Sequence, residues 1–366
     1  MDEQPMLPPE IILQVLRHLS CISTADKVAY AASRATLVVC SLLSRAWRPV
    51  VLSELCRNVR IKELAVDRGL LPWFISRVLD DNDSDVDRRF LVRELSIDLD
   101  QGHQKKHTKH QVPRELGRMP RLQAIELCGF HIEWASLFQS YPSLKRVALS
   151  GCLVNTTLSL STVVHAEELA LDNCTILTRD DTKWSLDPRV FPKLNSLTIK
   201  GPLHMSGDMF LGAFERIIDR VERLALSFEP RWEPTGPSAA QLNLWITHLL
   251  ARCSSLSSIS LDIVTINPWI ALALRAATLR PRYSQDIRHL EIVLQPDKEH
   301  QPIRDMSLCF SRLMMIELRS GALPKLETFR VVDRDGKDLK DVMVTRGLVE
   351  QLQQTGVALS SANVWR

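Results

Sequence analysis

The sequence lacks the short motifs that most often mark an enzyme. It contains no GxSxG, no HExxH, no phosphate-binding P-loop and no GxGxxG. These absences argue against serine hydrolases, zinc proteases and nucleotide-binding enzymes. Acidic pairs such as Glu167-Glu168 and Asp180-Asp181 are too common in proteins to indicate a mechanism. We therefore expect no catalytic residues, no cofactor and no metal site, and we expect that the protein is not an enzyme.

Secretory and membrane signals are also missing. The first residues, Met1-Asp2-Glu3, carry no basic segment, and no apolar run approaches the length that spans a bilayer. The eight cysteines include no CxxC pair, so reduced thiols fit the sequence better than a disulfide framework. We expect a protein of the cytoplasm, the nucleus or both, without a membrane partner.

Neither sign of charge is in large excess. The 46 basic and 43 acidic side chains leave a formal net charge of +3, which is too near neutral to indicate a nucleic-acid partner. With 45% hydrophobic and 24% charged residues, the chain is expected to fold rather than to be disordered. Its 366 residues suit one large domain or two smaller ones.

The stretch from Leu7 to Ser20 predicts a short apolar helix. Pro8 and Pro9 suit the first turn of a helix, where a missing N–H costs no hydrogen bond, and Glu10 suits the positive end of the helix dipole. Apolar side chains then recur at helical spacing: Ile11, Ile12, Val15, Leu16 and Leu19. A stripe this apolar on so short a helix must be covered, either by the rest of the chain or by a partner protein.

Two more helices and a strand are predicted before residue 62. Thr36–Trp47 predicts a second helix and Val50–Arg57 a third, with Arg48-Pro49 interrupting them. Val59–Ile61 then predicts a short strand. Three helices of this size bury little surface, so we expect them to be only marginally stable when isolated.

These residues resemble the F-box. The family begins with Leu-Pro-x-Glu-Ile/Leu and ends its second apolar helix near a tryptophan, as this chain does between Leu7 and Trp47. The connection from Cys21 to Thr36 departs from the family because it is longer than usual. The resemblance implies that a Skp-family adaptor is bound by Leu7, Pro8, Glu10, Ile11, Leu16, Leu19, Leu37, Val39, Leu43 and Trp47.

A recurring pattern, apolar-x-x-apolar-x-apolar, occupies the rest of the chain. Its nine copies centre on Leu95, Ile125, Val147, Leu169, Leu197, Leu224, Ile259, Leu290 and Phe329. The alternation has a period of two and predicts short strands with one buried face. The spacing runs from 22 to 39 residues and resembles degenerate leucine-rich repeats, as in fungal-type F-box proteins. Helices are predicted between strands at Asp208–Val221, Ala240–Cys253, Arg304–Met315 and Leu339–Gln354.

We therefore expect an α/β protein, with an N-terminal three-helix F-box-like domain over residues 1–58 and an irregular leucine-rich-repeat-like α/β solenoid over residues 59–366. A doubly wound α/β sheet would suit the same alternation, but no glycine-rich phosphate loop follows a strand. Cys152 and Cys174 stand where such repeats carry Asn or Cys after the strand. We expect these thiols to be buried structural groups rather than nucleophiles.

The residues between the buried ones are expected to share one face of the sheet. That face is predicted to be acidic in the first four repeats and mildly basic beyond, although any one of its residues equally fits a solvated surface. The candidate substrate-binding residues on it are Glu94, Asp98, Glu126, Arg146, Glu168, Asp172, Lys200 and Arg223.

Two functions follow from these expectations. In the first, the chain is the substrate-recognition adaptor of a Skp–cullin–F-box ubiquitin ligase, which raises the local concentration of a protein substrate near the ubiquitin-charged enzyme. In the alternative, it is a non-enzymatic leucine-rich-repeat scaffold whose N-terminal helices only cap the solenoid. A small-ligand pocket on the sheet face is a third possibility, and the sequence identifies neither a ligand nor the substrate.

Overall fold

The computed structural model contains both helices and parallel strands, so the expected α/β class is confirmed. The chain divides into two compact units, Met1–Val154 and Asn155–Arg366, and each is described by itself. The structure describes residues 11, 14–16, 27–43, 47–64, 88–100, 119–155, 163–177, 186–200, 214, 216–227, 253, 255–263, 286–294, 315, 319, 323–332, 338–340 and 344–360.

The first unit begins with helices that differ from the prediction. Helix α2 spans Lys27–Leu43, so the predicted start at Thr36 and the predicted long connection from Cys21 to Thr36 are wrong. Four alanines between residues 27 and 36 give this segment a high helix propensity. In addition, Tyr30, Ser33 and Leu37 are buried at i, i+3 and i+7 and give it one packed face.

Helix α3 spans Arg48–Arg57 and carries Pro49 in its first turn, so the proline starts this helix instead of separating it from Val50. Strand β1, Asn58–Leu64, follows directly and is longer than the predicted Val59–Ile61. A domain boundary after residue 58 stays a prediction, although helix changes to strand at that point.

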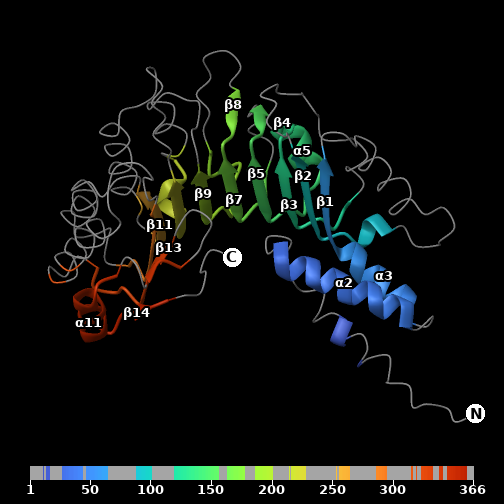
Figure 1. Cartoon of the computed structure of the whole chain (residues 1–366). Coiled ribbons are helices and arrows are strands. Elements are labelled where there is room, and N and C mark those ends of the chain that lie inside the picture. The colour runs from blue at the N-terminus through green and yellow to red at the C-terminus, as the bar shows by residue number, and fades with distance from the viewer. Residues whose placement is uncertain are drawn as a thin grey trace, which may run out of the picture. The chain divides into compact units, whose positions relative to one another are not determined.

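The sheet of the first unit contains four parallel strands in the order β1-β2-β3-β5 (Figure 1). Glu94, Ala124 and Arg146 occupy equivalent positions in β2, β3 and β5, and so do Asp98, Cys128 and Ser150. The remaining elements of this unit are η2 (Arg88–Leu91), β2 (Glu94–Asp100), β3 (Ala124–Cys128), β4 (His131–Glu133), α5 (Trp134–Ser140), β5 (Arg146–Ser150) and β6 (Leu153–Asn155).

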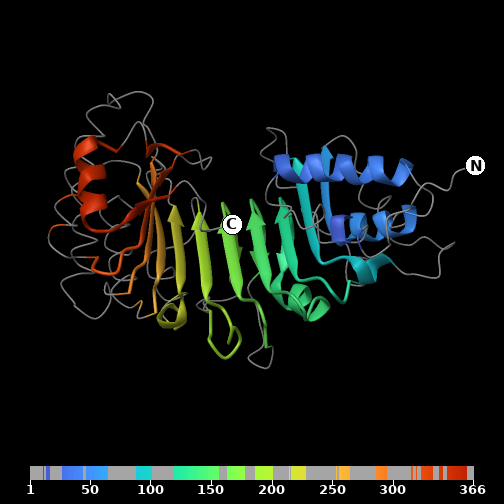
Figure 2. The same ribbon diagram turned by 90° about the horizontal axis from the view of Figure 1, so that it is seen from below.

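The sheet of the second unit has the order β7-β9-β10-β11-β12-β13-β14, and every neighbouring pair in it is parallel. Figure 2 shows these strands side by side. The elements are β7 (Glu168–Asp172), β8 (Thr175–Leu177), β9 (Ser196–Lys200), η4 (Ile218–Arg220), β10 (Arg223–Ser227), β11 (Ser258–Ile263), β12 (His289–Leu294), β13 (Thr328–Val332), α11 (Arg346–Gln354) and β14 (Ala358–Leu359).

The nine predicted strands are confirmed, because each predicted central residue is buried and lies in a parallel strand. Helix α11 confirms the last part of the predicted helix Leu339–Gln354. The predicted helix Asp208–Val221 is described only in part and ends in the short η4. Ala240–Cys253 and Arg304–Met315 lie outside the described residues except for their last residue.

A tight turn precedes most of these strands, and the predicted motif started too late to include it. In four cases the turn reads apolar-Pro-x-apolar, with proline at the position where its fixed φ suits a turn. Its first carbonyl accepts a hydrogen bond from the N–H three residues on, at 3.2 Å in three of the turns and at 3.5 Å in the turn that begins at Phe191. The four turns begin at Met119, Tyr141, Phe191 and Leu323.

The carbonyl just before each strand ties that strand to the next one. The Arg93 carbonyl accepts the N–H groups of Gln123 and Ala124 at 2.7 and 3.0 Å, and the Gln123 carbonyl accepts those of Lys145 and Arg146 at 2.7 and 3.0 Å. Five carbonyls of the second unit do the same: Glu167, Asn195, Glu222, Ser257 and Arg288. Satisfying these groups within the stack fixes the register of successive strands.

A residue with positive φ follows each of β3, β5 and β7: Gly129 at 81°, Gly151 at 58° and Asn173 at 50°. Gly and Asn are the residues that adopt this conformation most readily. The expected burial of Cys152 and Cys174 after two of these turns is confirmed. The Cys152 thiol donates to the Leu127 carbonyl of the neighbouring strand at 3.3 Å.

Candidate functional site

The helices of the first unit share a small apolar core. Leu16, Leu37 and Val51 are 1%, 0% and 0% exposed and pack together. Partly buried side chains surround them: Cys40, Trp47, Val50 and Leu55. The inner face of α2 is therefore used to hold the helices together.

The outer face of α2 carries apolar side chains that the described residues leave exposed. Val38, Val39 and Leu42 are 47%, 54% and 80% exposed, and they lie within one turn of each other on the side opposite Leu37. Ile11 and Val15, four residues apart in the preceding helical segment, are also exposed. We call Val38, Val39 and Leu42 the head patch. Together with Ile11 and Val15 they are most of the large apolar side chains exposed in the described chain. Neighbouring exposed apolar side chains such as those of the head patch are typical of a protein-binding surface.

The predicted adaptor contacts fall into three groups. Ile11 is exposed and Val39 is exposed in the head patch, whereas Leu16 and Leu37 are buried in the helix core and Trp47 is half-buried. Leu7, Pro8, Glu10, Leu19 and the side chain of Leu43 lie outside the described residues. Their role in binding a partner stays a prediction.

The sequence reasoning missed Val38 and Leu42. The signal was available: Ala31, Ala35, Val38, Val39 and Leu42 follow the i, i+4, i+7 spacing once α2 is extended back to Lys27. A helix begun at Thr36 is too short to separate this outer stripe from the inner one.

Tyr30 joins α2 to the edge of the sheet. Its buried hydroxyl donates to the Asn58 carbonyl at 3.0 Å and accepts the Arg60 N–H at 3.0 Å. Both groups belong to β1, which is an edge strand, so one side chain satisfies backbone groups that a neighbouring strand would otherwise pair. Arg34 lies over the Tyr30 ring, 5.4 Å from its centre. Burial raises the pKa of Tyr30, so the hydroxyl stays protonated and can donate.

The sheet face of the first unit carries an ion pair that spans three strands. The Arg146 Nη2 atom lies 2.6 Å from Glu94 Oε1, and Ala124 occupies the equivalent position in the strand between them. The methyl group of Ala124 leaves room for the long arginine side chain to reach across.

The second unit repeats this arrangement. The Arg223 Nη2 atom lies 2.5 Å from Glu168 Oε1, and Ser196 is the small residue between them. Further along the same face, Arg330 and Glu291 form a nearly buried pair at 2.6 Å. Glu291 also accepts a hydrogen bond from Ser260 at 2.9 Å.

Four of the eight predicted substrate-binding residues are therefore bonded to one another: Glu94, Arg146, Glu168 and Arg223. Of the others, Asp98, Glu126 and Asp172 are half-buried and Lys200 is exposed. The pairing halves the charge that these residues offer to a partner, and a role in substrate binding stays a prediction.

Cys128 is the thiol on this face and lies beside Asp98. Burial, with the nearby Asp98 carboxylate, raises the pKa of Cys128 to about 11. The thiol is protonated at neutral pH, so it is a poor nucleophile. Within the described residues, no group of three or more His, Cys, Asp or Glu is placed to hold a metal ion.

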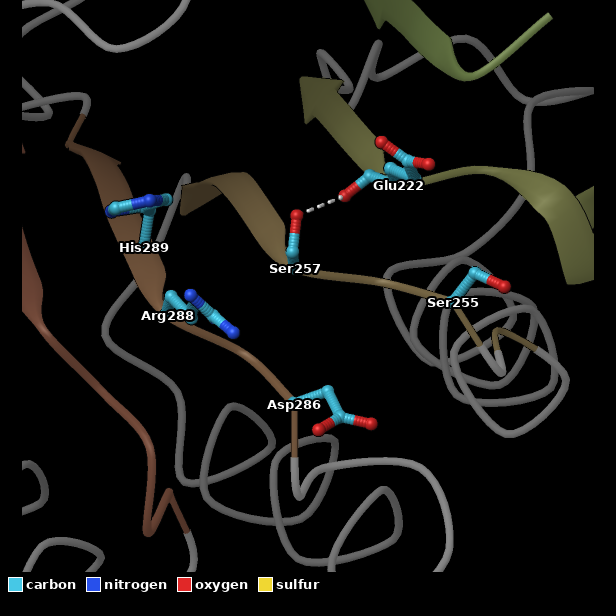
Figure 3. Close-up of a pocket in the computed structure, with 6 residues that line it drawn as sticks. All are labelled: Glu222, Ser255, Ser257, Asp286, Arg288 and His289. Carbon is cyan, nitrogen blue, oxygen red and sulfur yellow. Dashed lines mark hydrogen bonds between the residues drawn. The ribbon is translucent and has the colours of Figure 1, made fainter. Parts of the chain in front are cut away.

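A polar hollow of about 450 Å³ lies where β10, β11 and β12 begin (Figure 3). Glu222, Ser255, Ser257, Asp286, Arg288 and His289 line it. Much of its charge is already satisfied, because Asp286 pairs with Lys325 and Arg288 with Glu327. The Ser257 hydroxyl donates to the Glu222 carbonyl at 3.2 Å. The hollow is open and much of its charge is already paired. It is therefore a weaker candidate for a binding site than the head patch.

No model of a known protein family and no curated protein matches this chain. None of the helices in the described part of the chain combines the length and the apolarity needed to cross a membrane.

Proposed function

We propose that the chain is the substrate-recognition adaptor of a Skp–cullin–F-box ubiquitin ligase. In this proposal residues 1–58 are an F-box-like head that docks a Skp-family adaptor. The parallel strands belong to an irregular leucine-rich-repeat-like solenoid that holds a protein substrate. The chain would act in the cytoplasm, the nucleus or both, and it would catalyse no reaction itself.

The observation that carries this proposal is the head patch. A solvent-exposed leucine and two valines on one side of α2 have no role in the packing of the head, which uses Leu16, Leu37 and Val51 instead. When a partner covers exposed apolar side chains of this kind, binding is stabilised by roughly 25 cal/mol per Å² of apolar surface removed from water. The corrected start of α2 also supports the F-box resemblance, because it removes most of the long connection that departed from the family.

The repeated turn and carbonyl ladder support the solenoid part of the proposal. Most of the strands are preceded by a similar turn, and seven of the carbonyls that precede a strand make the same pair of hydrogen bonds to the next one. A unit that buries its apolar face only against its neighbours is the physical basis of repeat proteins.

Co-purification with a Skp-family adaptor tests the proposal. The wild-type chain is expected to retain the adaptor, and the double variant V39D/L42D to lose at least about tenfold in affinity, because both changes place charge in an apolar contact. Thr36→Asp is the control: it adds one negative charge, half the change of the double variant, to an exposed position of the same helix and should bind like the wild type. Equal thermal unfolding midpoints would show that all variants fold.

The scaffold alternative is favoured by one observation, the two hydrogen bonds by which Tyr30 covers the edge of β1. If the helices only cap the sheet, the wild-type chain should bind no adaptor and V39D/L42D should change nothing except solubility. Adaptor binding that is lost only in the double variant would refute the scaffold model.

A further inference from the structure

The polar hollow where β10, β11 and β12 begin contains a carboxylate without an ion pair to the described residues. This carboxylate belongs to Glu222, which is exposed. Asp286, also in the lining, pairs with Lys325, but both of these side chains are more than half exposed. Solvent screens such a pair, so it contributes little and opens easily. A cation that enters the hollow can therefore compete for both carboxylates.

The two serines that line the hollow offer a ligand only acceptors. The Ser257 hydroxyl donates to the Glu222 carbonyl at 3.2 Å (Figure 3), and the Ser255 hydroxyl donates to the Asp219 carbonyl at 2.9 Å. A serine hydroxyl has one proton to donate and two lone pairs, so these hydrogen bonds leave only lone pairs for a ligand. With the two carboxylates, the serine oxygens give the hollow four acceptor groups.

Arg288 is the one arginine or lysine in the lining, and its partner is Glu327 at 3.5 Å rather than Glu222. The backbone nevertheless places Glu222, Ser257 and Arg288 at equivalent positions of three neighbouring strands. The Glu222 carbonyl accepts the Ser257 N–H at 2.8 Å, and the Ser257 carbonyl accepts the Arg288 N–H at 2.8 Å. A glutamate and an arginine therefore stand two strands apart with a small residue between them.

On the sheet faces, this order of residues closes into an ion pair. Arg146 reaches Glu94 at 2.6 Å in the first unit, and Arg223 reaches Glu168 at 2.5 Å in the second. At the hollow, the equivalent pair is not made, because the arginine is bonded to the strand on its other side. A guanidinium supplied from outside the chain would complete for Glu222 the contact that Arg146 and Arg223 make within it.

We propose that the polar hollow binds an arginine side chain carried by a partner protein. A guanidinium has five N–H donors in a planar fork, which suits acceptors spread over three strands better than the compact ammonium group of lysine does. The volume of about 450 Å³ lies within the roughly 300–1,000 Å³ usual for binding pockets. Because the hollow is open, it would bury only part of a free small molecule, whereas a protein segment also contacts the rim.

Two other classes of ligand fit less well. A phosphate or sulfate would face the carboxylates of Glu222 and Asp286, and charges of one sign repel each other. A metal ion would need a cluster of acidic, histidine or cysteine ligands, and no such group of three or more is formed by the described residues. The proposal concerns the second unit alone and stands whether or not the head patch binds a Skp-family adaptor.

Binding of a labelled peptide, repeats of Arg-Gly-Ser-Gly, to the full-length chain tests the proposal. We expect binding that weakens as salt is added and is absent when citrulline, an uncharged counterpart of arginine, replaces arginine. The lysine peptide should bind at least roughly threefold more weakly. Glu222→Lys should raise the Kd of the arginine peptide by roughly tenfold, because an attraction becomes a repulsion, and Glu222→Gln by roughly threefold.

The exposed ion pair of Arg346 and Glu350 in α11, at 3.0 Å, supplies matched controls. Glu350→Lys makes the same charge change in the same unit but outside the hollow, and it should leave the Kd within about twofold. Lys325→Gln releases Asp286 and should lower the Kd by roughly threefold, whereas Arg346→Gln should leave it unchanged. Equal thermal unfolding midpoints would show that all variants fold.

Several results would overturn the proposal. They are no binding to the wild type, undiminished binding of the citrulline or lysine peptide, equal losses for Glu222→Lys and Glu350→Lys, or equal effects of Lys325→Gln and Arg346→Gln. Free arginine that binds as tightly as the peptide would assign the hollow to a small molecule instead. Glu222→Lys should still retain a Skp-family adaptor and V39D/L42D should still bind the peptide, so this test and that of the head patch fail separately.

Discussion

Arg146 reaches across an entire strand to bond with Glu94, at 2.6 Å and a sequence separation of 52 residues. The same contact recurs between Arg223 and Glu168, which are 55 residues apart. In both cases a small residue, Ala124 or Ser196, stands between the partners. The sheet face of each unit thus carries a pair of opposite charges that lie two strands apart.

The first prediction concerns this ion pair. A double-mutant cycle with Glu94→Gln and Arg146→Gln should give a coupling free energy of about 0.5–1 kcal/mol, at the upper end for partly exposed pairs. The side chains of Glu94 and Arg146 are 20% and 41% exposed, so solvent screens the pair only in part.

The cycle is measured by urea unfolding, and Asp286 with Lys325 supplies the control. Their side chains are 54% and 55% exposed, and we expect their coupling to be near zero. Ala124→Leu should lower the coupling between Glu94 and Arg146 because the larger side chain fills the path of the arginine. An unchanged coupling in that background would contradict the role given to the small residue.

The second prediction concerns the edge of β1. Tyr30→Phe keeps the ring but removes the hydroxyl, which leaves the Asn58 carbonyl and the Arg60 N–H without this partner. We expect the free energy of unfolding to fall by about 1–2 kcal/mol, and hydrogen exchange at the Arg60 amide to become faster. Chemical denaturation and exchange mass spectrometry measure the two effects.

Tyr141→Phe is the control for this change. Tyr141 is also buried, and burial raises its pKa. Its hydroxyl, unlike that of Tyr30, makes no hydrogen bond to a described residue. We expect a loss below about 0.5 kcal/mol. Equal losses for the two variants would mean that Tyr30 acts through packing alone.

The third prediction concerns Cys128 and pH. Its pKa is about 11 in the folded chain against 9.0 for an ordinary thiol. Between these pH values the unfolded chain releases the thiol proton and the folded chain keeps it. The unfolded chain therefore binds fewer protons than the folded chain, so the free energy of unfolding falls as the pH rises. Unfolding measured from pH 8 to 11 should therefore show a steeper loss of stability for the wild type than for Cys128→Ala. If the free energy of unfolding of the two proteins fell equally with pH, the raised pKa of Cys128 would be refuted.

The fourth prediction concerns the turns after the strands. Gly151 adopts a φ of 58°, and a Cβ built there meets nothing within 4 Å. Gly151→Ala should therefore cost about 1 kcal/mol through backbone strain alone. Asn173→Gly, at the equivalent position with a φ of 50°, should be neutral or slightly stabilising. Thermal unfolding of both variants measures the difference, and a large loss for Asn173→Gly would indicate that the side chain matters.

The sequence predicted the strands well because their signal is local. At Leu169 and Leu171, as at the other copies, an alternating apolar pattern is a property of five consecutive residues. The start of α2 was missed because alanine and a single tyrosine carry little apolar pattern, although the helix propensity of alanine is high. The turn before most strands was missed because the motif was begun too late, for example at Leu122 rather than at Met119.

The amino-acid sequence alone determined which residues of each repeat are buried, since burial on a strand follows from the period of two. Only the tertiary structure decided which charges remain available to a partner, because Glu94 and Arg146 meet only when three strands stack in register. It also decided that Leu37 packs inward and Leu42 outward. A side chain's partners depend on distance in space. For residues more than fifty positions apart, the sequence around each one does not show that the two are neighbours in the fold.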